Sequence, residues 1–313
     1  MAISSTRSKL ARKYAPRRFG RGRRVRGRAK EFERILFIAG VALVLVLFLK
    51  LLTGMIFKSG NTSIKLSDVE ALRIPIASVQ TLDTLSGKYD IPLADLLTVY
   101  SLENNFFPEK NPDIDTTAIE TQFVAHFSTV KAKYSSSALK PFEDLFGSIT
   151  GEIKYFPVRW DPGGADCPYA YSDSWGAASS DDGAKTHQGC DILDRDNIRG
   201  RLQVVSMTDG TVTACGWDNT CGYYVGITAE SGNYYYYAHL DHFAAGVAQG
   251  VEVTAGGLLG YMGDTGSGKE GTTGKYLVHL HVGISPSAKI TSKKYWINPY
   301  PFLRLAEMQE NND

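Results

Sequence analysis

Cysteine is scarce in this chain, and no two cysteines have the spacing of a thiolate metal site. The 313 residues contain four cysteines, and none of them belongs to a CxxC pair. Zinc sites made of cysteine commonly use such closely spaced pairs. A zinc site that rests on the cysteines is therefore disfavoured, and metal ligands are to be sought among histidines and carboxylates.

A complete nucleotide-binding motif is also absent. Residues 263–269, GDTGSGK, come close to the phosphate-binding pattern GxxxxGK[ST]. However, Glu270 stands where that loop needs a Ser or Thr hydroxyl for Mg²⁺, and no helical pattern follows it. We therefore expect no nucleotide site in this segment.

The net charge of +1 hides a strong asymmetry along the chain. Residues 1–34 contain 13 Lys and Arg against Glu31 and Glu33, a net of +11, so the remaining residues carry 21 basic and 31 acidic groups, a net of −10. This basic tail is rich in Gly and Arg and should not fold alone. Because no aromatic platform accompanies its arginines, we expect it to meet anionic lipid head groups and not nucleic acid.

Residues 35–57, ILFIAGVALVLVLFLKLLTGMIF, carry a single charge, Lys50, and the first 15 of them carry none. A stretch of this length and polarity predicts one transmembrane helix. A cleaved signal peptide is the main alternative, but no small-x-small cleavage site follows the apolar run. The Lys and Arg bias puts the tail in the cytoplasm and residues 58–313 outside the cell. We therefore expect a single-pass protein of the cell membrane.

All four cysteines lie in the part of the chain that is expected outside the cell, where disulfides are permitted. Cys215 and Cys221 flank GWDNT, a turn-like sequence that would let them meet across a hairpin. Cys167 and Cys190 would form the remaining pair.

Residues 58–151 are predicted to form a small helical, membrane-proximal region. Apolar residues recur there at intervals of three and four, which is the spacing of one helix face. The expected helices cover residues 76–89, 92–104, 116–134 and 137–146.

Part of this region, residues 82–108, resembles two families that handle cell-wall glycan. One is the LysM sugar-binding module, and the other is the lytic transglycosylases, in which a helix ends in a glutamate that would be Glu103. The flanking strands of the first family and the later glycine- and glutamine-rich motif of the second are missing. A helical spacer that packs on the next domain is therefore the favoured interpretation.

Residues 152–313 are predicted to form a mainly β domain. From Tyr155 onward, short alternating runs such as VVSMTDGTVTACG and YYVGITAESGNYYYYAHL are separated by turn residues. This pattern indicates hairpin-rich antiparallel sheets. We expect these sheets to form a groove that carries the chemistry of the chain.

Histidines and one aspartate give this domain a candidate metal site. His279 and His281 stand two residues apart in KYLVHLHVGI, so a strand would point both to one face. His187 and Asp191 stand four apart in THQGCDI, where Gly189 would allow the chain to bend. Two histidines and one carboxylate, with water as the fourth ligand, make a site suited to catalytic zinc.

The order of four motifs carries a family resemblance. HQGCDI, YAHL, GYMGDTGSG and HLHVGI follow one another between residues 187 and 284. Together they resemble the lysostaphin-type, or LytM-like, zinc peptidases, which cleave peptide bonds in bacterial peptidoglycan. The resemblance implies that His187, Asp191 and His281 bind one Zn²⁺, and that His239 and His279 flank the reacting groups. It leaves open which of these two histidines is the general base.

Two functions from different classes follow from this resemblance. The first is a zinc-dependent endopeptidase that hydrolyses peptide cross-links, with peptide stems or cross-bridges of peptidoglycan as its partners. The second is a non-catalytic scaffold that binds the wall within a membrane or envelope-spanning assembly. All five residues of the constellation are present, and this favours the enzyme. His242 is expected at the surface or in a supporting role.

Overall fold

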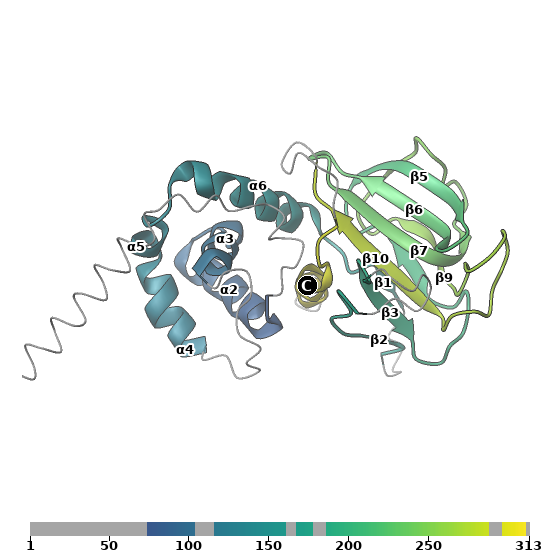
Figure 1. The fold of residues 1–313 in the computed structure, drawn as a ribbon, viewed down its shortest axis with the longest axis horizontal. Helices are drawn as coiled ribbons and strands as arrows, with labels where there is room; N and C mark the ends of the chain where they lie inside the picture. Colours follow the sequence, from purple (N-terminus) through teal and green to yellow (C-terminus); the bar gives the residue numbers. More distant parts are fainter. Residues whose placement is uncertain (1–73, 104–115, 161–166, 178–185, 288–295, 311–313) are drawn as a thin grey trace, which may run out of the picture. The chain divides into compact units, whose positions relative to one another are not determined.

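The computed structural model describes residues 74–103, 116–160, 167–177, 186–287 and 296–310 (Figure 1). The predicted basic tail and the predicted transmembrane segment, residues 35–57, lie outside these ranges. Among the described residues, no helix is both long enough and apolar enough to span a bilayer.

Helices occupy the first described part of the chain (Figure 1). Their bounds are α2 Ile76–Tyr89, α3 Leu93–Glu103, α4 Thr116–Ala118, the π-helix η2 Ile119–Phe123, the 3₁₀-helix η3 Val124–His126, α5 Phe127–Lys131 and α6 Ser136–Glu152. Helix α2 has the predicted bounds, residues 76–89. The single helix predicted over residues 116–134 is wrong, because a π-helical and a 3₁₀ segment interrupt it.

Local capping accounts for two of these boundaries. Helix α2 stops at Asp90, whose left-handed φ of 52° lets its N–H bond back to Ser86. Helix α6 starts after Ser135, whose hydroxyl accepts the N–H of Ala138. It runs six residues beyond the predicted end at residue 146, since Phe146 and Ile149 are buried on the same face of the helix.

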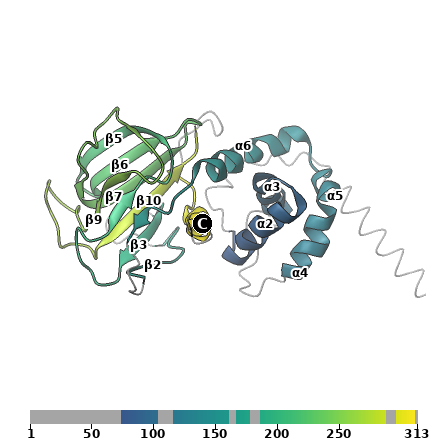
Figure 2. The same cartoon turned by 180° about the vertical axis from the view of Figure 1, so that it is seen from behind.

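Ten strands form one antiparallel sheet within the described residues (Figures 1 and 2). Their bounds are β1 Val158–Arg159, β2 Tyr169–Tyr171, β3 Cys190–Asp194, β4 Gln203–Val205, β5 Gly210–Asp218, β6 Gly222–Thr228, β7 Tyr234–Phe243, β8 Glu252–Val253, β9 Leu258–Met262 and β10 His279–Ser285. The order is β1-β4-β9-β7-β10-β3-β2, and β5, β6 and β8 branch from this path. The mainly β, antiparallel prediction is confirmed, but the strands belong to one sheet and not to several.

The sheet curls so that its two end strands approach each other. Phe156, just before β1, stacks on Tyr169 of β2 with ring centroids 5.1 Å apart. Both rings are buried, at 1% and 8% exposure. This aromatic contact joins strands that stand at opposite ends of the hydrogen-bonded order.

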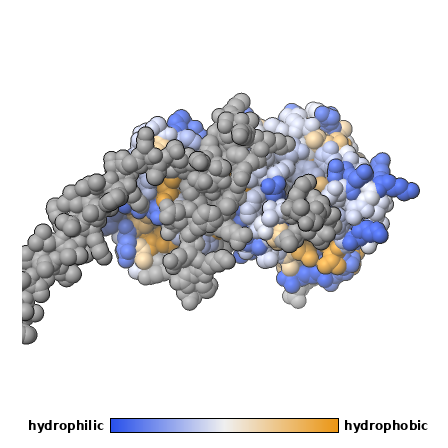
Figure 3. Space-filling view, in the orientation of Figure 1, coloured by the Kyte–Doolittle hydropathy of each residue, from blue (hydrophilic) through white to orange (hydrophobic). Residues whose placement is uncertain are grey.

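Alternation along β7 and β10 separates a core face from a second face. Tyr235 and Tyr237 of β7 are fully buried, as are Leu280 and Val282 of β10. Their neighbours point the other way, and among these are the histidines of β10. The prediction that His279 and His281 share one face is thus confirmed by the strand itself. On the side drawn in Figure 3, hydrophilic and weakly polar surface predominates over the β domain.

A C-terminal helix was not anticipated within the β domain. Helix α8, Tyr300–Glu310, buries Phe302, Leu303 and Leu305 and brings Phe302 to 6.4 Å from the ring of Phe146. At its start, the Asn298 side chain accepts the N–H of Tyr300, the first residue of the helix.

The expected disulfides are not formed, since none of the four cysteines is joined to another. In the β5–β6 hairpin, Cys215 lies opposite Val225, so Cys221 is displaced along the partner strand. Strands β2 and β3 pair Tyr169 with Asp194. If the same register continued, Cys167 would lie opposite residue 196, about six residues from Cys190. That is about 20 Å along the strand, far beyond the reach of a disulfide.

One carboxylate ties helix α6 to the sheet. Glu152 accepts hydrogen bonds from the Ser231 N–H, the Asn233 side-chain amide and the Tyr235 hydroxyl, each at 3.1 Å. Asn233 and Tyr235 are fully buried. Removing the carboxylate would therefore leave buried donors without an acceptor.

We expect Glu152→Ala to lower the free energy of unfolding by about 3 kcal/mol, because a charged acceptor of several bonds is lost. Urea unfolding followed by circular dichroism measures this. The control is Glu230→Ala, an exposed glutamate near the same turn, with an expected change below about 0.5 kcal/mol. Equal effects of the two substitutions would contradict this role of Glu152.

Candidate metal centre and active site

Three side chains predicted as metal ligands meet at one point on the second face of the sheet. His187 Nε2 lies 2.9 Å from His281 Nδ1 and 3.1 Å from Asp191 Oδ1, and His281 Nδ1 lies 3.0 Å from that same oxygen. Within the described part of the chain, this is the only group of three or more His, Cys, Asp or Glu side chains close enough to hold a metal ion.

Strand pairing places two of these ligands. Asp191 of β3 stands directly opposite His281 of β10 in the antiparallel register, so their side chains leave the sheet side by side. The third ligand, His187, precedes β3 and is held by backbone bonds to Gly176 and Ala177.

The lack of a side chain at Gly189 leaves room for the ring of His281. A Cβ added there would lie 2.3 Å from Cε1 and 2.5 Å from Nε2 of His281, and 2.7 Å from the carbonyl oxygen of Val282. The sequence interpretation of Gly189 as a bend residue is therefore incomplete. Any larger residue would push against the ring of a presumed ligand.

A backbone carbonyl sets the tautomer of His187. Its Nδ1 lies 2.9 Å from the Ser174 carbonyl oxygen, which can only accept a hydrogen bond. In neutral His187 the proton is therefore on Nδ1, and Nε2 directs a lone pair toward Asp191 and His281. Such an outer hydrogen bond is characteristic of metal-binding histidines.

The donor set fits a divalent zinc ion. Two imidazole nitrogens and one carboxylate oxygen are ligands that catalytic zinc uses, and tetrahedral ligands of zinc are about 3.3 Å apart. The three observed separations of 2.9–3.1 Å are close to that spacing. A cation between these atoms would satisfy a carboxylate and two ring nitrogens at once.

The electrostatics favour an ionised carboxylate at this point. Burial alone would raise the pKa of Asp191, but the adjacent rings of His187 and His281, which donate hydrogen bonds to the carboxylate when they are protonated, outweigh it and hold that pKa far below its ordinary value. Burial also lowers the pKa of His281, which favours the neutral imidazole that a metal requires.

A second pair of imidazoles lies beside the three ligands. The rings of His239 and His279 are 4.5 Å apart, and the ring of His239 is 6.3 Å from that of His281. His239 Nδ1 lies 2.7 Å from the Thr265 carbonyl oxygen, and His279 Nδ1 lies 2.7 Å from that of Leu277. In their neutral forms both rings thus donate through Nδ1 and keep Nε2 as an acceptor.

The backbone of His239 is unusual. Its φ is +60°, a left-handed conformation that few residues other than glycine adopt. The pairing of β7 with β9 shifts register just beyond it, between Leu240 and His242. Register shifts of this kind re-aim side chains near functional sites. His239 is 9% exposed, and burial, followed by the nearby His279, lowers its pKa to about 3.

The segment that resembled a phosphate loop has a different role in the structure. Thr265 accepts the His239 ring proton with its carbonyl oxygen and donates its own hydroxyl to the Leu240 carbonyl at 2.7 Å. Its neighbour Asp264 accepts the Gly274 N–H at 2.8 Å and pairs with Arg199 at 3.2 Å. The glycine-rich motif is visible in the sequence, but no sequence pattern indicates that Thr265 and Asp264 support His239.

His242 stays apart from the cluster. Its side chain is 56% exposed, pairs with Asp241 at 2.8 Å and stacks on the ring of Tyr261. Neither partner belongs to the metal-ligand group, which agrees with the surface role expected for His242.

Parts of this chain are similar to known proteins. Residues 185–293 match the group described as Peptidase family M23. The chain is also 36% identical, over 155 residues, to a protein of Bacillus subtilis named L-Ala--D-Glu endopeptidase. That alignment covers 49% of this chain but only 43% of the Bacillus protein.

Two solved structures are similar. One is a Ruminococcus gnavus protein described as glycyl-glycine endopeptidase lytM, with 30% identity and a TM-score of 0.62, covering 82% of this chain and 96% of that chain. The other is the catalytic domain of lysostaphin from Staphylococcus simulans, with 25% identity and a TM-score of 0.34, covering 44% of this chain and 92% of that chain. The Ruminococcus alignment is longer than residues 152–313, so that likeness extends into the helical region.

Substituting Gly189 with Ala should weaken metal binding about tenfold to a hundredfold, because the new methyl group displaces the His281 ring. Zinc titration of the protein, with metal content measured by mass spectrometry after dialysis, tests this. The matched control is Gly87→Ala, since a Cβ at Gly87 meets nothing within 4 Å. Unchanged affinity in Gly189→Ala would show that His281 is not held as described.

Proposed function

Because the chain belongs to peptidase family M23, a family of metalloendopeptidases, we propose that it is a zinc-dependent endopeptidase of bacterial peptidoglycan. One observation carries the proposal. Three ligand atoms, from His187, Asp191 and His281, lie within 3.1 Å of one another, and two further imidazoles stand next to them. Such an arrangement combines a metal site with proton acceptors, as amide hydrolysis requires.

The same three residues would hold the zinc ion. Bound there, zinc supplies Lewis-acid chemistry that polarises a carbonyl oxygen and lowers the pKa of water. Asp191 offers its negative charge to the ion, and His187 offers Nε2 because the Ser174 carbonyl occupies its other nitrogen.

The two remaining histidines have different roles in the reaction. Protonating both His239 and His279 is disfavoured, because their ring centroids are 4.5 Å apart and the two positive charges would repel each other. His239 is the more buried of the two, and its lowered pKa of about 3 keeps it neutral near pH 7. We therefore assign proton uptake to His279, whose Nε2 accepts the proton of the attacking water.

Hydrolysis of the scissile amide then forms one bond and breaks another. A carbon–oxygen bond forms to the carbonyl carbon, and His279 returns its proton to the amide nitrogen as the carbon–nitrogen bond breaks. Neutral His239 accepts a hydrogen bond through Nε2 and so orients the water or a substrate N–H. With its ring proton committed to Thr265, it has no donor left for an oxyanion.

The choice of substrate rests on the relatives. The Bacillus protein is named for an L-Ala--D-Glu bond, and the Ruminococcus protein is described by a glycyl-glycine bond. Both are amide bonds between small residues or small and acidic ones. We propose a peptide stem or cross-bridge of peptidoglycan as the substrate here.

Anchoring would place this activity at the wall. We propose that residues 35–57 span the cell membrane and that the catalytic domain lies outside the cell. The sequence supports this through its apolar run and its basic N-terminal flank. An additional role within an envelope-spanning assembly is compatible with the same topology.

Incubating the full-length protein with purified peptidoglycan tests the function. We expect new amino and carboxyl termini, detected by mass spectrometry, and no new reducing sugars. Chelation followed by dialysis should abolish the cleavage, and added Zn²⁺ should restore it. A protein that binds wall fragments but produces no new termini at any zinc concentration would support the scaffold alternative.

Three histidine variants separate the proposed roles. His281→Ala should lose zinc and activity together. His279→Ala should keep zinc but lose activity about 10²- to 10⁴-fold, the contribution of a general base. His242→Ala, which changes an exposed histidine of the same sheet, should keep both. Loss of zinc in His279→Ala, or full activity in it, would contradict the assignment.

A further inference from the structure

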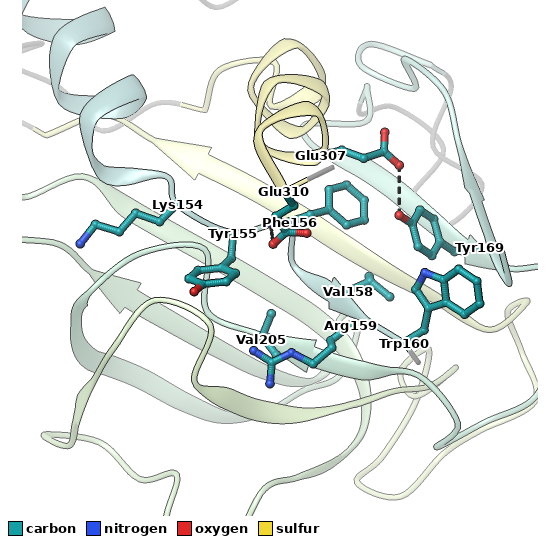
Figure 4. A pocket seen from close by; sticks show the side chains of 10 residues that line it. All are labelled: Lys154, Tyr155, Phe156, Val158, Arg159, Trp160, Tyr169, Val205, Glu307 and Glu310. Carbon is teal, nitrogen blue, oxygen red and sulfur yellow. Dashed lines mark hydrogen bonds between the residues drawn. The ribbon is translucent and has the colours of Figure 1, made fainter. Parts of the chain in front are cut away.

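A cavity of about 650 Å³ lies where the end strands of the sheet meet the C-terminal helix (Figure 4). Its lining comes from segments far apart in the sequence: Lys154, Tyr155, Phe156, Val158, Arg159, Trp160, Tyr169, Val205, Glu307 and Glu310. None of the three presumed metal ligands or the two catalytic histidines lines it. Its size is within the range of small-ligand sites.

Buried contacts hold the inner wall of this cavity in shape. Phe156 stacks on Tyr169, and the Tyr169 hydroxyl donates to Glu307 at 3.0 Å. The Phe156 N–H donates to Glu310 at 2.8 Å. A wall fixed by rings and by two helix carboxylates loses little conformational entropy when a ligand binds.

Flat aromatic side chains stand at the cavity on opposite sides. Tyr155 and Trp160 flank it, and Val158 and Val205 lie between them (Figure 4). Tyr155 is 41% exposed, so part of its side chain is open to solvent beside the cavity. Two rings and an apolar floor suit a ligand that has flat apolar faces.

The polar groups of the cavity are few and nearly balanced in charge. Glu307 is already occupied by Tyr169, Tyr171 and Arg304. Lys154 pairs with Asp209. This leaves one anionic group, Glu310, and one cationic group, Arg159.

Among the described residues, both of these groups have hydrogen-bonding atoms without a partner. Glu310 accepts the Phe156 N–H with Oε1, and its Oε2 has no hydrogen-bond partner among the described residues. Within the described ranges, Arg159 donates a single hydrogen bond, from Nη2 to the Gly256 carbonyl oxygen at 2.7 Å. The cavity therefore offers one acceptor and several donors to a ligand, with little net charge.

We propose that this cavity binds an uncharged N-acetylhexosamine unit of the peptidoglycan glycan strand, a proposal that rests on the proposed function. A pyranose ring presents apolar C–H faces to aromatic rings and hydroxyl groups at its edge. Those hydroxyls donate to Glu310 and accept from Arg159. A stem peptide fits less well, because its carboxylates would add negative charge beside Glu310 and Glu307.

The consequence is a division of labour within one domain. The cavity holds the glycan, while the metal centre acts on the peptide attached to it. Binding of intact wall would then depend on both sites, whereas cleavage of a free peptide would depend on the metal centre alone.

Isothermal titration of the full-length protein with a tetramer of β-1,4-linked N-acetylglucosamine tests the proposal. We expect saturable binding that Tyr155→Ala and Trp160→Ala each weaken about tenfold, through loss of a stacking ring. The control is Tyr89→Ala, because Tyr89 is 38% exposed but does not line the cavity. No binding of the tetramer, or equal binding by all variants, would overturn the proposal.

Two further readouts separate this inference from the proposed function. Tyr155→Ala should cleave a soluble stem peptide at the wild-type rate but intact peptidoglycan several-fold more slowly. His281→Ala should bind the tetramer normally and cleave neither substrate. If the protein cleaves peptides but binds only the stem peptide and not the tetramer, the glycan site fails and the peptidase stands. If the protein binds the tetramer but cleaves neither substrate, the glycan site stands and the proposed peptidase function fails.

Discussion

The pairing of β3 with β10 is the constraint on which the rest of the site depends. It places the Asp191 carboxylate directly opposite His281, and the loop before β3 brings His187 to the same point. Three electron-pair donors about 3 Å apart are costly to assemble unless a cation joins them. The surrounding structure maintains this arrangement by leaving space at Gly189, where a Cβ would strike the His281 ring, and by burying the opposite face of both strands.

Backbone carbonyls, and not side chains, orient three of the four histidines at the centre. Ser174 fixes His187, Thr265 fixes His239 and Leu277 fixes His279. Each carbonyl leaves one ring nitrogen as an acceptor toward the metal or the substrate. Because carbonyls cannot be lost by side-chain substitution, the tautomers are a property of the fold. The loop with Thr265 is in turn held by the ion pair of Asp264 with Arg199, and Arg199 also pairs with Asp241 of β7.

Sequence patterns predicted the features that depend on local periodicity. Alternation placed His279 and His281 on one face, and helical spacing predicted both bounds of α2. Features that depend on tertiary contacts could not be predicted in the same way. The positive φ of His239 arises at a register shift, and the role of Gly189 is visible only beside a ring 92 residues away. The predicted disulfides failed because strand register, which the cysteine spacing does not report, separates the pairs.

Zinc held by His187, Asp191 and His281 is the central claim, and anomalous X-ray diffraction from crystals of the zinc-loaded protein tests it most directly. Data collected on both sides of the zinc absorption edge should give one strong anomalous peak. We predict this peak at about 2.0–2.2 Å from His187 Nε2, Asp191 Oδ1 and His281 Nδ1. A peak at other residues, or none at this position in zinc-saturated crystals, would contradict the account.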